Sequence, residues 1–381
     1  MKCLFVFEGG AGAILPVIPL AQALRSAGHD VIAAAHAEAL PTLLGAGIPA
    51  VPAPAKAPKD YREMRDGKLV PLTGGLDERA SALGAIGARI AADTHRDLLR
   101  VAGQWRPDLI VGGPLAYAAP LLSGGLHIPY VAVEFGFAEP ENWHRATLDE
   151  LARLGFGSLP APATTFLMCP ESIRPAAGGA LRRLAGEPVR YVPHSSARPV
   201  ESWMLAKGPR PRVWISAGTR VGTDYALDHL DELIGAAATL DAELLIAAPD
   251  GVAEHLTALP ADARAGWLPF DVLAPTCDLA VHHGGGSTML GFAAHGIPQV
   301  IVPNVVEFEE YLSPMSTTGA ARVLGAQEQT PQRVVAACEE LLGDPAYRRA
   351  AEQLRAEMSA APSPLDAVRR LEDVAAAAAR A

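Results

Sequence analysis

The sequence has few cysteines. Cys3, Cys169, Cys277 and Cys338 are the only four in 381 residues, and they lie far apart along the chain. No two have the close spacing of a zinc site, and four are too sparse for a disulfide framework in a chain of this length. We therefore expect reduced thiols in a cytoplasmic protein, with no metal ligands among them.

Long hydrophobic runs and basic tracts are missing as well. Gly, Pro or charge interrupts each apolar run well before the roughly 20 residues that a membrane helix needs. The apolar start Met1–Phe7 runs into a Gly-rich turn, so we expect a buried first strand rather than a signal sequence. The net charge is −10, and no Lys/Arg-rich tract offers a phosphate-binding surface. We expect no membrane and no nucleic acid as partners.

Short β-branched segments bounded by Gly and Pro alternate with longer segments of helical period. This alternation is typical of parallel sheets with crossover helices, so the predicted fold class is α/β. Strands are expected at Lys2–Phe7, Val31–Ala35, Leu109–Val111, Tyr130–Glu134, Arg212–Ser216, Glu243–Ala247, Leu279–His282 and Gln299–Val302, and a helix at Pro19–Ala27.

The length of the chain suits two domains rather than one. The strand pattern restarts after a Pro- and Ser-rich stretch, from Val192 to Pro211. We predict a first domain over residues 1–195, a linker over 196–210, a second domain over 211–361 and a helix over 362–381 that packs back on the first domain. Ligands of such sheets bind beyond the carboxyl ends of the strands.

A glycine-rich segment follows one of these strand ends. The run His283-Gly-Gly-Gly-Ser-Thr288 precedes the helical Met289–His295. Its glycines let the backbone approach a ligand, and the N–H groups at a helix start favour a diphosphate without a metal. His283 can donate a further hydrogen bond, and Ser287 and Thr288 supply hydroxyls. A tight turn with a simple N-cap is the structural alternative.

Two more strand ends carry similar signals. The strand Arg212–Ser216 is followed by Gly218 and Thr219. Trp267 and Leu268 offer an aromatic plane and an apolar neighbour for a pyrimidine, although a lone Trp before Pro more often packs in a core. Three such loops at successive strand ends are hard to attribute to packing alone.

These motifs resemble the inverting glycosyltransferases of actinomycete antibiotic pathways, and most of all the olivosyl C-glycosyltransferases of angucycline biosynthesis. The resemblance covers essentially the whole chain and includes Leu15–Leu24, Arg106–Gly113, Leu159–Pro162 and Cys169-Pro170. It implies a GT-B architecture, in which two Rossmann-like domains face each other across a cleft. The amino-terminal domain would bind the acceptor and the carboxy-terminal domain the nucleotide sugar.

The resemblance also implies roles for single residues. Trp267 and Leu268 would hold a thymine, Ser216 and Thr219 would lie near the phosphates, and the glycine-rich run would bind the diphosphate. Glu307 and Phe308 stand where the family has Asp and Gln, and the ring suits a sugar with fewer hydroxyls, such as TDP-D-olivose. The expected donor site is Ser216, Gly218, Thr219, Trp267, Leu268, His283, Gly285, Gly286, Ser287, Thr288, Glu307 and Phe308.

The catalytic base is where the chain departs from the family. Members that glycosylate oxygen carry Gly-His-x-x-Pro, and here Ala13 replaces the His and cannot accept a proton. C-glycosylating relatives use a carboxylate that aligns with Gly136. We predict Glu134, two residues earlier on the same side of the strand, as the base, with Glu139 as second candidate. The alternative is that Glu134 is only a solvated carboxylate at a strand end, without a catalytic role.

The predicted reaction is therefore the inverting transfer of a TDP-deoxysugar to an aromatic polyketide through a C-glycosidic bond, without a cofactor or an essential metal. An O-glycosyltransferase with the same donor is the nearest alternative. Ala13 also permits a catalytically silent protein that only binds the nucleotide sugar. A nicotinamide dehydrogenase is disfavoured because Leu15 stands where the last Gly of the dinucleotide motif would be. A homodimer is the assembly that we expect.

Overall fold

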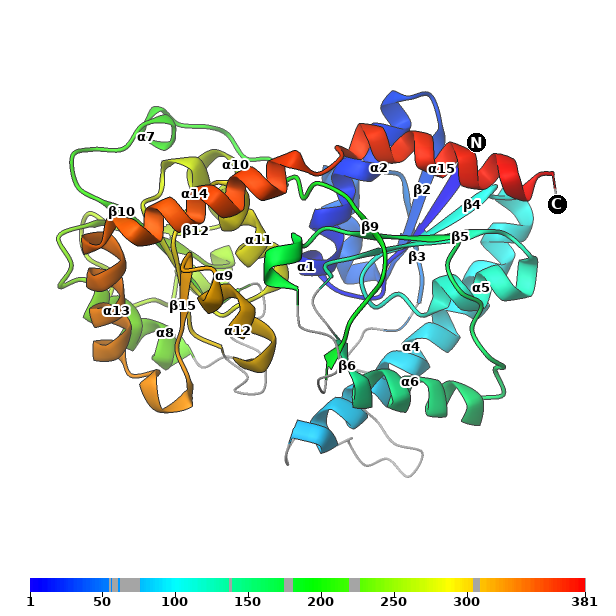
Figure 1. Cartoon of the computed structure of the whole chain (residues 1–381), viewed down its shortest axis with the longest axis horizontal. Helices are drawn as coiled ribbons and strands as arrows, with labels where there is room; N and C mark the ends of the chain where they lie inside the picture. The colour runs from blue at the N-terminus through cyan, green and yellow to red at the C-terminus, as the bar shows by residue number, and fades with distance from the viewer. Residues whose placement is uncertain are drawn as a thin grey trace. The chain divides into compact units, whose positions relative to one another are not determined.

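The computed structural model describes residues 1–54, 56, 61, 76–136, 139–174, 181–218, 227–303 and 309–380. By its contacts the chain forms two units, each with a parallel sheet and helices against it (Figure 1). The first unit comprises residues 1–169, 174–190 and 361–381, and the second comprises 170–173 and 191–360. The predicted α/β class is confirmed in both units.

The sheet of the first unit has seven strands in the order β3-β2-β1-β4-β5-β7-β9, and all neighbours pair in parallel. Its strands are β1 Lys2–Val6, β2 Asp30–Ala35, β3 Ala50–Pro52, β4 Leu109–Gly112, β5 Tyr130–Glu134, β7 Thr164–Leu167 and β9 Glu187–Pro188. The central β1 and β4 are buried and apolar along almost their whole length because both of their faces are covered. A separate antiparallel pair is formed by β6 Glu139–Pro140 and β8 Leu181–Arg182.

The helices of the first unit include the last helix of the chain. They are α1 Ala11–Ile14, α2 Ile18–Ser26, α3 Leu40–Gly45, α4 Leu76–Trp105, α5 Ala118–Leu126, α6 Glu141–Arg153 and α15 Pro364–Ala378, with 3-10 turns η1 Leu15–Val17 and η2 Ala37–Ala39. Helix α15, red in Figure 1, lies along α2. Its Glu372 pairs with His29 at 2.9 Å, and its Arg370 pairs with Glu187 at 2.9 Å. The C-terminal segment is therefore part of the first unit.

The second unit has six parallel strands in the order β12-β11-β10-β13-β14-β15. Its strands are β10 Arg212–Ser216, β11 Glu243–Ala247, β12 Arg264–Gly266, β13 Leu279–His282, β14 Gln299–Ile301 and β15 Ala321–Val323. Its helices are α7 Ser202–Leu205, α8 Leu227–Ala237, α9 Asp250–Ala253, α10 Phe270–Leu273, α11 Gly286–Ala294, α12 Glu309–Thr317, α13 Pro331–Gly343 and α14 Pro345–Ala360, with 3-10 turns η4 Glu171–Ile173, η5 Ala274–Thr276 and η7 Ala326–Glu328.

The segment 196–210, where a linker is expected, has contacts to the second unit. Met204 of α7 belongs to a core cluster with Trp214 and Phe292. Arg212 is 1% exposed, pairs with Glu243 at 2.8 Å and donates to the Trp203 carbonyl at 3.1 Å. These bonds stabilise the buried charge of Arg212 and connect α7 to the start of β10.

Four strands have the predicted bounds, namely β5, β10, β11 and β13, and the other predicted strands differ by one residue at an end. The short strands β3, β6, β7, β8, β9, β12 and β15 were not predicted from the sequence. In the part of the chain that the structure describes, no helix combines the length and apolar character needed to cross a membrane.

Candidate functional site

The sheet of the second unit has a topological switch point at β10. The chain runs from β10 to β11 and β12 on one side and then crosses to β13, β14 and β15 on the other. A crevice forms beyond the carboxyl ends of strands at such a point, and ligands bind there. Ser216 at the end of β10 is in register with His282 at the end of β13. The structure thus brings together two of the loops predicted from the sequence to bind the donor.

The imidazole of His283 is packed between these two loops. A Cβ built on Gly218, whose φ is +86°, would lie 2.4 Å from Cε1 of His283. One built on Gly285 would lie 2.6 Å from Nε2 of the same ring. The Gly218 amide also donates to Ser216 Oγ at 3.1 Å, which fixes the turn after β10. Both glycines are therefore needed for the close approach of backbone and ring.

The start of α11 presents backbone N–H groups. Its N-cap is Gly285, which has no side chain to accept from them. The first N–H groups of a helix are not used by its own carbonyls, and here, at Gly286, Ser287 and Thr288, they lie at the positive end of the helix dipole. The buried Tyr191 donates from its hydroxyl to the Ser287 carbonyl at 2.9 Å and so fixes this first turn. An anion is stabilised at such a helix end.

A buried histidine that the sequence reasoning missed supports the same turn. His282 is 1% exposed, its Nε2 lies 2.8 Å from Gln299 Oε1, and its Nδ1 accepts from the Gly284 amide at 3.0 Å. Gln299 in turn donates to the Met289 carbonyl of α11 at 3.2 Å. Burial lowers the pKa of His282 to about 3, so the ring is neutral and carries its proton on Nε2. The alternation of side chains along β13 could have shown that His282 and His283 differ, because adjacent residues of a strand point to opposite faces of the sheet.

Trp267 and Leu268 follow β12 at the edge of the same sheet. The Trp267 amide donates to Asp250 Oδ1 at 2.9 Å, and Arg198 pairs with that carboxylate at 2.7 Å. These two bonds hold the pKa of Asp250 below its usual range. Leu268 packs against the core cluster that contains Trp214, whereas Trp267 is half-buried outside it. The backbone of this predicted base-binding loop is thus anchored by a carboxylate.

Some predicted residues lie outside the described residues. These are Thr219, Glu307 and Phe308, and the Glu139 side chain, of which only the backbone in β6 is described. Glu134 is the last residue of β5 and is partly exposed. Gly136 has a φ of +90°, a conformation that side-chain-bearing residues rarely adopt. The backbone at residue 136 is therefore unsuited to a residue with a side chain, such as the carboxylate that the family resemblance would place here.

The first unit has a switch point of its own, between β1 and β4. Glu8 follows β1 there, and its Oε1 accepts from the Ala118 amide at 3.2 Å. Burial raises the pKa of Glu8 to about 8. The Tyr117 amide also lies near this carboxyl group, and the Tyr117 hydroxyl is 2.9 Å from Nδ1 of His144 in α6. The sequence reasoning considered Glu8 only as part of a glycine-rich loop and did not identify this group.

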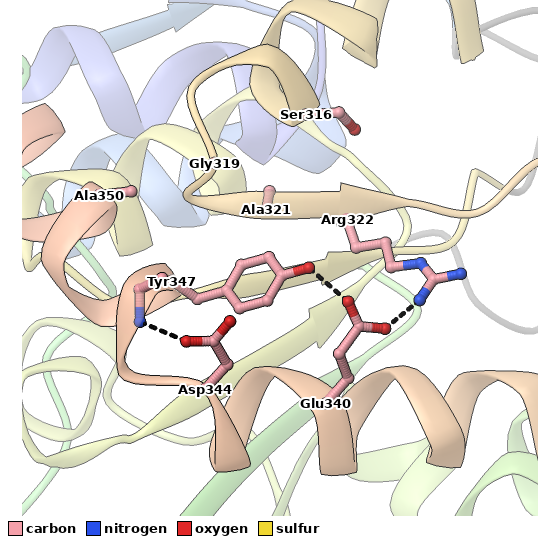
Figure 2. Close-up of a pocket in the computed structure, with 9 residues that line it drawn as sticks. Ser316, Gly319, Ala321, Arg322, Glu340, Asp344, Tyr347 and Ala350 are labelled. Carbon is pink, nitrogen blue, oxygen red and sulfur yellow. Dashed lines mark hydrogen bonds and ion pairs between the residues drawn. The ribbon is translucent and has the colours of Figure 1, made fainter.

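A cavity of about 530 Å³ lies elsewhere in the second unit, at the outer strand β15 (Figure 2). It is lined by Ser316, Gly319, Ala321, Arg322, Glu340, Asp344, Ala346, Tyr347 and Ala350. Figure 2 shows Arg322 and Tyr347 directed toward Glu340, which accepts hydrogen bonds from both. These polar groups satisfy one another, and no predicted site residue is among them. We regard this cavity as structural.

The cysteines and acidic residues form no metal site within the described residues, since no three His, Cys, Asp or Glu side chains gather there as ligands. All four cysteines are buried, and none of them is in a disulfide bond. Burial raises the pKa of Cys3, Cys277 and Cys338 to about 12, so these groups stay as thiols.

Two α/β units with parallel sheets, each with a topological switch point, are the architecture of glycosyltransferases of the GT-B class. The crystal structure of the Streptomyces sp. SF2575 glycosyltransferase SsfS6 with thymidine diphosphate has the same fold, with a TM-score of 0.85 and 30% identity over 98% of this chain and 99% of that one. Residues 22–218 and 231–374 match the N-terminal and C-terminal domains of the erythromycin biosynthesis protein CIII-like family. The chain belongs to this family.

Two relatives of known activity are similar over nearly their whole length. The L-demethylnoviosyl transferase of Streptomyces niveus is 32% identical over 96% of each chain. The elloramycin glycosyltransferase ElmGT of Streptomyces olivaceus is 30% identical over 97% of each chain. The predicted enzyme class is thereby confirmed, and the chain is an antibiotic-type glycosyltransferase. Its C-glycosylating activity and its olivose donor stay predictions.

Proposed function

We propose that the protein transfers a 2,6-dideoxysugar from TDP to a phenolic polyketide, with inversion at the anomeric carbon and formation of a C-glycosidic bond. The second unit holds the donor and the first unit the acceptor. The switch point between β10 and β13 carries this proposal, because there the N-terminus of α11, which has no side-chain cap, and the His283 ring meet at one sheet edge. The thymidine diphosphate bound by SsfS6 supports the same nucleotide here.

The donor diphosphate binds at the start of α11. The amides of Gly286, Ser287 and Thr288, with the side chain of His283, stabilise the charge that grows on TDP as the sugar departs. Ser216 and Thr219 complete the phosphate site, and Trp267 stacks on thymine. This assignment needs no metal for the leaving group, because preorganised N–H groups take over that role.

The sugar and the linkage follow from the sequence reasoning. Glu307 and Phe308 contact the sugar, and the aromatic ring favours a donor with few hydroxyls, such as TDP-D-olivose. A carboxylate of the first unit, with Glu134 and Glu139 as the predicted candidates, accepts the phenolic proton. The ortho carbon then forms a bond to the anomeric carbon while the bond to the diphosphate breaks. The ring carbon then loses its proton to solvent, the phenolate oxygen takes back a proton from the carboxyl group, and TDP leaves with the electron pair of the broken bond.

The proposal is tested by incubating the purified protein with TDP-D-olivose and a panel of hydroxyanthraquinones, followed by acid hydrolysis of the products. We expect an adduct that survives acid. An acid-labile adduct would identify the O-glycosyltransferase instead. Binding of TDP in calorimetry without transfer to any acceptor would identify a silent nucleotide-sugar-binding protein.

A further inference from the structure

Glu8 lies beyond the carboxyl end of β1, at the switch point of the first unit. The Phe7 amide donates to the Ala34 carbonyl at 2.9 Å, and the Gly113 amide donates to the Val6 carbonyl at 3.0 Å, so strand pairing continues up to these residues. Glu8 is the next residue after Phe7. Its side chain therefore stands where β1 and β4 separate, which is where doubly wound sheets bind ligands.

The two oxygens of the Glu8 carboxyl group have different surroundings. Oε1 accepts from the Ala118 amide at the start of α5, at 3.2 Å. Oε2 is buried and has no hydrogen-bond partner among the residues that the structure describes. A buried oxygen without a partner destabilises the fold unless another group supplies the missing hydrogen bond. Oε2 is therefore the oxygen of Glu8 that can still take up a proton or a hydrogen bond.

Capping of α5 alone does not explain a carboxyl group here. A Gln at this position would accept the same hydrogen bond from Ala118 without placing an ionisable group in a buried site. The other groups near Glu8 are the Thr94 hydroxyl and the Tyr117 amide, which favour its ionised form. Burial outweighs them and raises the pKa of the carboxyl group to about 8.

The loop that carries Glu8 contacts the position of the missing histidine. A Cβ built on Gly9 would lie 2.7 Å from the Cβ of Ala13. The backbone next to Glu8 therefore packs directly on residue 13, and the small Ala13 side chain fits beside it. His36 lies against the Gly9 backbone on the β2 side, and burial lowers its pKa. Tyr117, the N-cap residue of α5, has its hydroxyl 2.9 Å from Nδ1 of His144 in α6.

We propose that Glu8, rather than Glu134 or Glu139, is the catalytic base, and that its Oε2 accepts the phenolic proton of the acceptor. This inference rests on the proposed function. The phenol O–H bond breaks as an Oε2–H bond forms, and the electron pair moves into the ring, whose ortho carbon attacks the sugar. The chain thus replaces a histidine at position 13 with a carboxylate from the adjacent loop.

The surroundings of Glu8 suit this role. A phenol has a pKa of about 10, and transfer to an ordinary carboxylate is strongly uphill. A base whose pKa lies closer to that of the phenol accepts the proton more readily, provided that it is ionised at the working pH. Activity should therefore rise with pH as Glu8 loses its own proton near its pKa of about 8.

The test compares Glu8→Gln with Glu134→Gln and the wild type. Glutamine keeps the shape of the side chain and the acceptor for the Ala118 amide. With TDP-D-olivose and a hydroxyanthraquinone, we expect Glu8→Gln to lower kcat roughly 10²–10⁴-fold with KM unchanged. The rise of kcat/KM with pH around 8 should disappear in Glu8→Gln and persist in Glu134→Gln.

Two further variants distinguish loss of the catalytic base from loss of folding. In Glu8→Ala, added formate should restore part of the activity, and in Glu8→Asp the rise with pH should remain although kcat falls. Calorimetry with TDP should give the wild-type affinity in all of them, because the donor site is in the second unit.

The inference is overturned if Glu8→Gln keeps kcat and the pH profile of the wild type. It is also overturned if formate restores nothing in a folded Glu8→Ala. Wild-type protein that transfers sugar to no acceptor would contradict the proposed function itself. If the wild type transfers sugar and Glu8→Gln transfers it equally well, only the role of Glu8 is contradicted and the proposed function stands.

Discussion

At the scale of single residues, two glycines determine where His283 lies. A methyl group at Gly218 or Gly285 would lie 2.4 or 2.6 Å from an atom of the imidazole, well inside van der Waals contact. An alanine at either position must displace the ring or its loop. The placement of the phosphate-binding donors therefore depends on the absence of side chains as much as on the donors themselves.

We predict that Gly285→Ala weakens TDP binding about tenfold or more, because a displacement of His283 and the α11 start loses at least one good phosphate contact, about 1.4 kcal/mol. Isothermal calorimetry with TDP measures this. The matched control is Gly251→Ala, since a Cβ there meets nothing within 4 Å. Equal affinities of the two variants would contradict the role assigned to Gly285.

The neutral His282 makes the stability of the second unit depend on pH. Its pKa is about 3 in the fold and 6.5 ordinarily, so between these values the unfolded chain binds a proton that the folded chain does not. The free energy of unfolding should therefore fall as pH is lowered through this window. Urea unfolding at a series of pH values should show a smaller dependence in His282→Phe. His255→Gln, at an exposed residue, should behave like the wild type.

At the scale of elements, the sequence predicted strands and switch-point loops better than it predicted polar partners. Tyr130–Glu134 and Arg212–Ser216 form with the predicted bounds because β-branched runs between Gly and Pro define a buried strand without help from distant residues. The Glu8 environment depends on Ala118, which lies 110 residues away in sequence. A local pattern cannot show such a partner. Burial of Glu8 and His282 was missed for the same reason.

The last helix, α15, is stabilised by a local cap. Ser363 Oγ accepts from the Asp366 amide at 3.3 Å, and the Ser363 amide donates to the Asp366 carboxylate at 2.9 Å. This capping box satisfies two backbone donors at the helix start. We predict that Ser363→Ala lowers the free energy of unfolding of the first unit by about 1 kcal/mol. Chemical denaturation measures the change, and Ser359→Ala, at an exposed position in α14, should leave the stability unchanged.

At the scale of the whole molecule, the chain enters the second unit at Tyr191 and returns to the first at Ala361. Residues 361–381 therefore complete the unit in which the chain began. Helix α15 buries Val368, Leu371 and Val374, and it lies along α2 near the start of the chain. Both ends of the sequence thus belong to the unit for which we propose acceptor binding, while the proposed donor site lies in a continuous stretch between them.

This organisation predicts that removal of residues 361–381 separates the two activities. Burial of a Leu or Val side chain contributes about 1.5–3 kcal/mol, so loss of three of them, with the Arg370–Glu187 pair, should destabilise the first unit strongly. The second unit keeps its sheet, its switch point and the start of α11. Hydrogen exchange should therefore show faster exchange in β1 and β2 of the truncated protein, while calorimetry still finds TDP bound and transfer to a hydroxyanthraquinone is lost. Loss of TDP binding together with transfer would show instead that the donor site depends on the first unit, and would argue against the assignment of the nucleotide to the second unit alone.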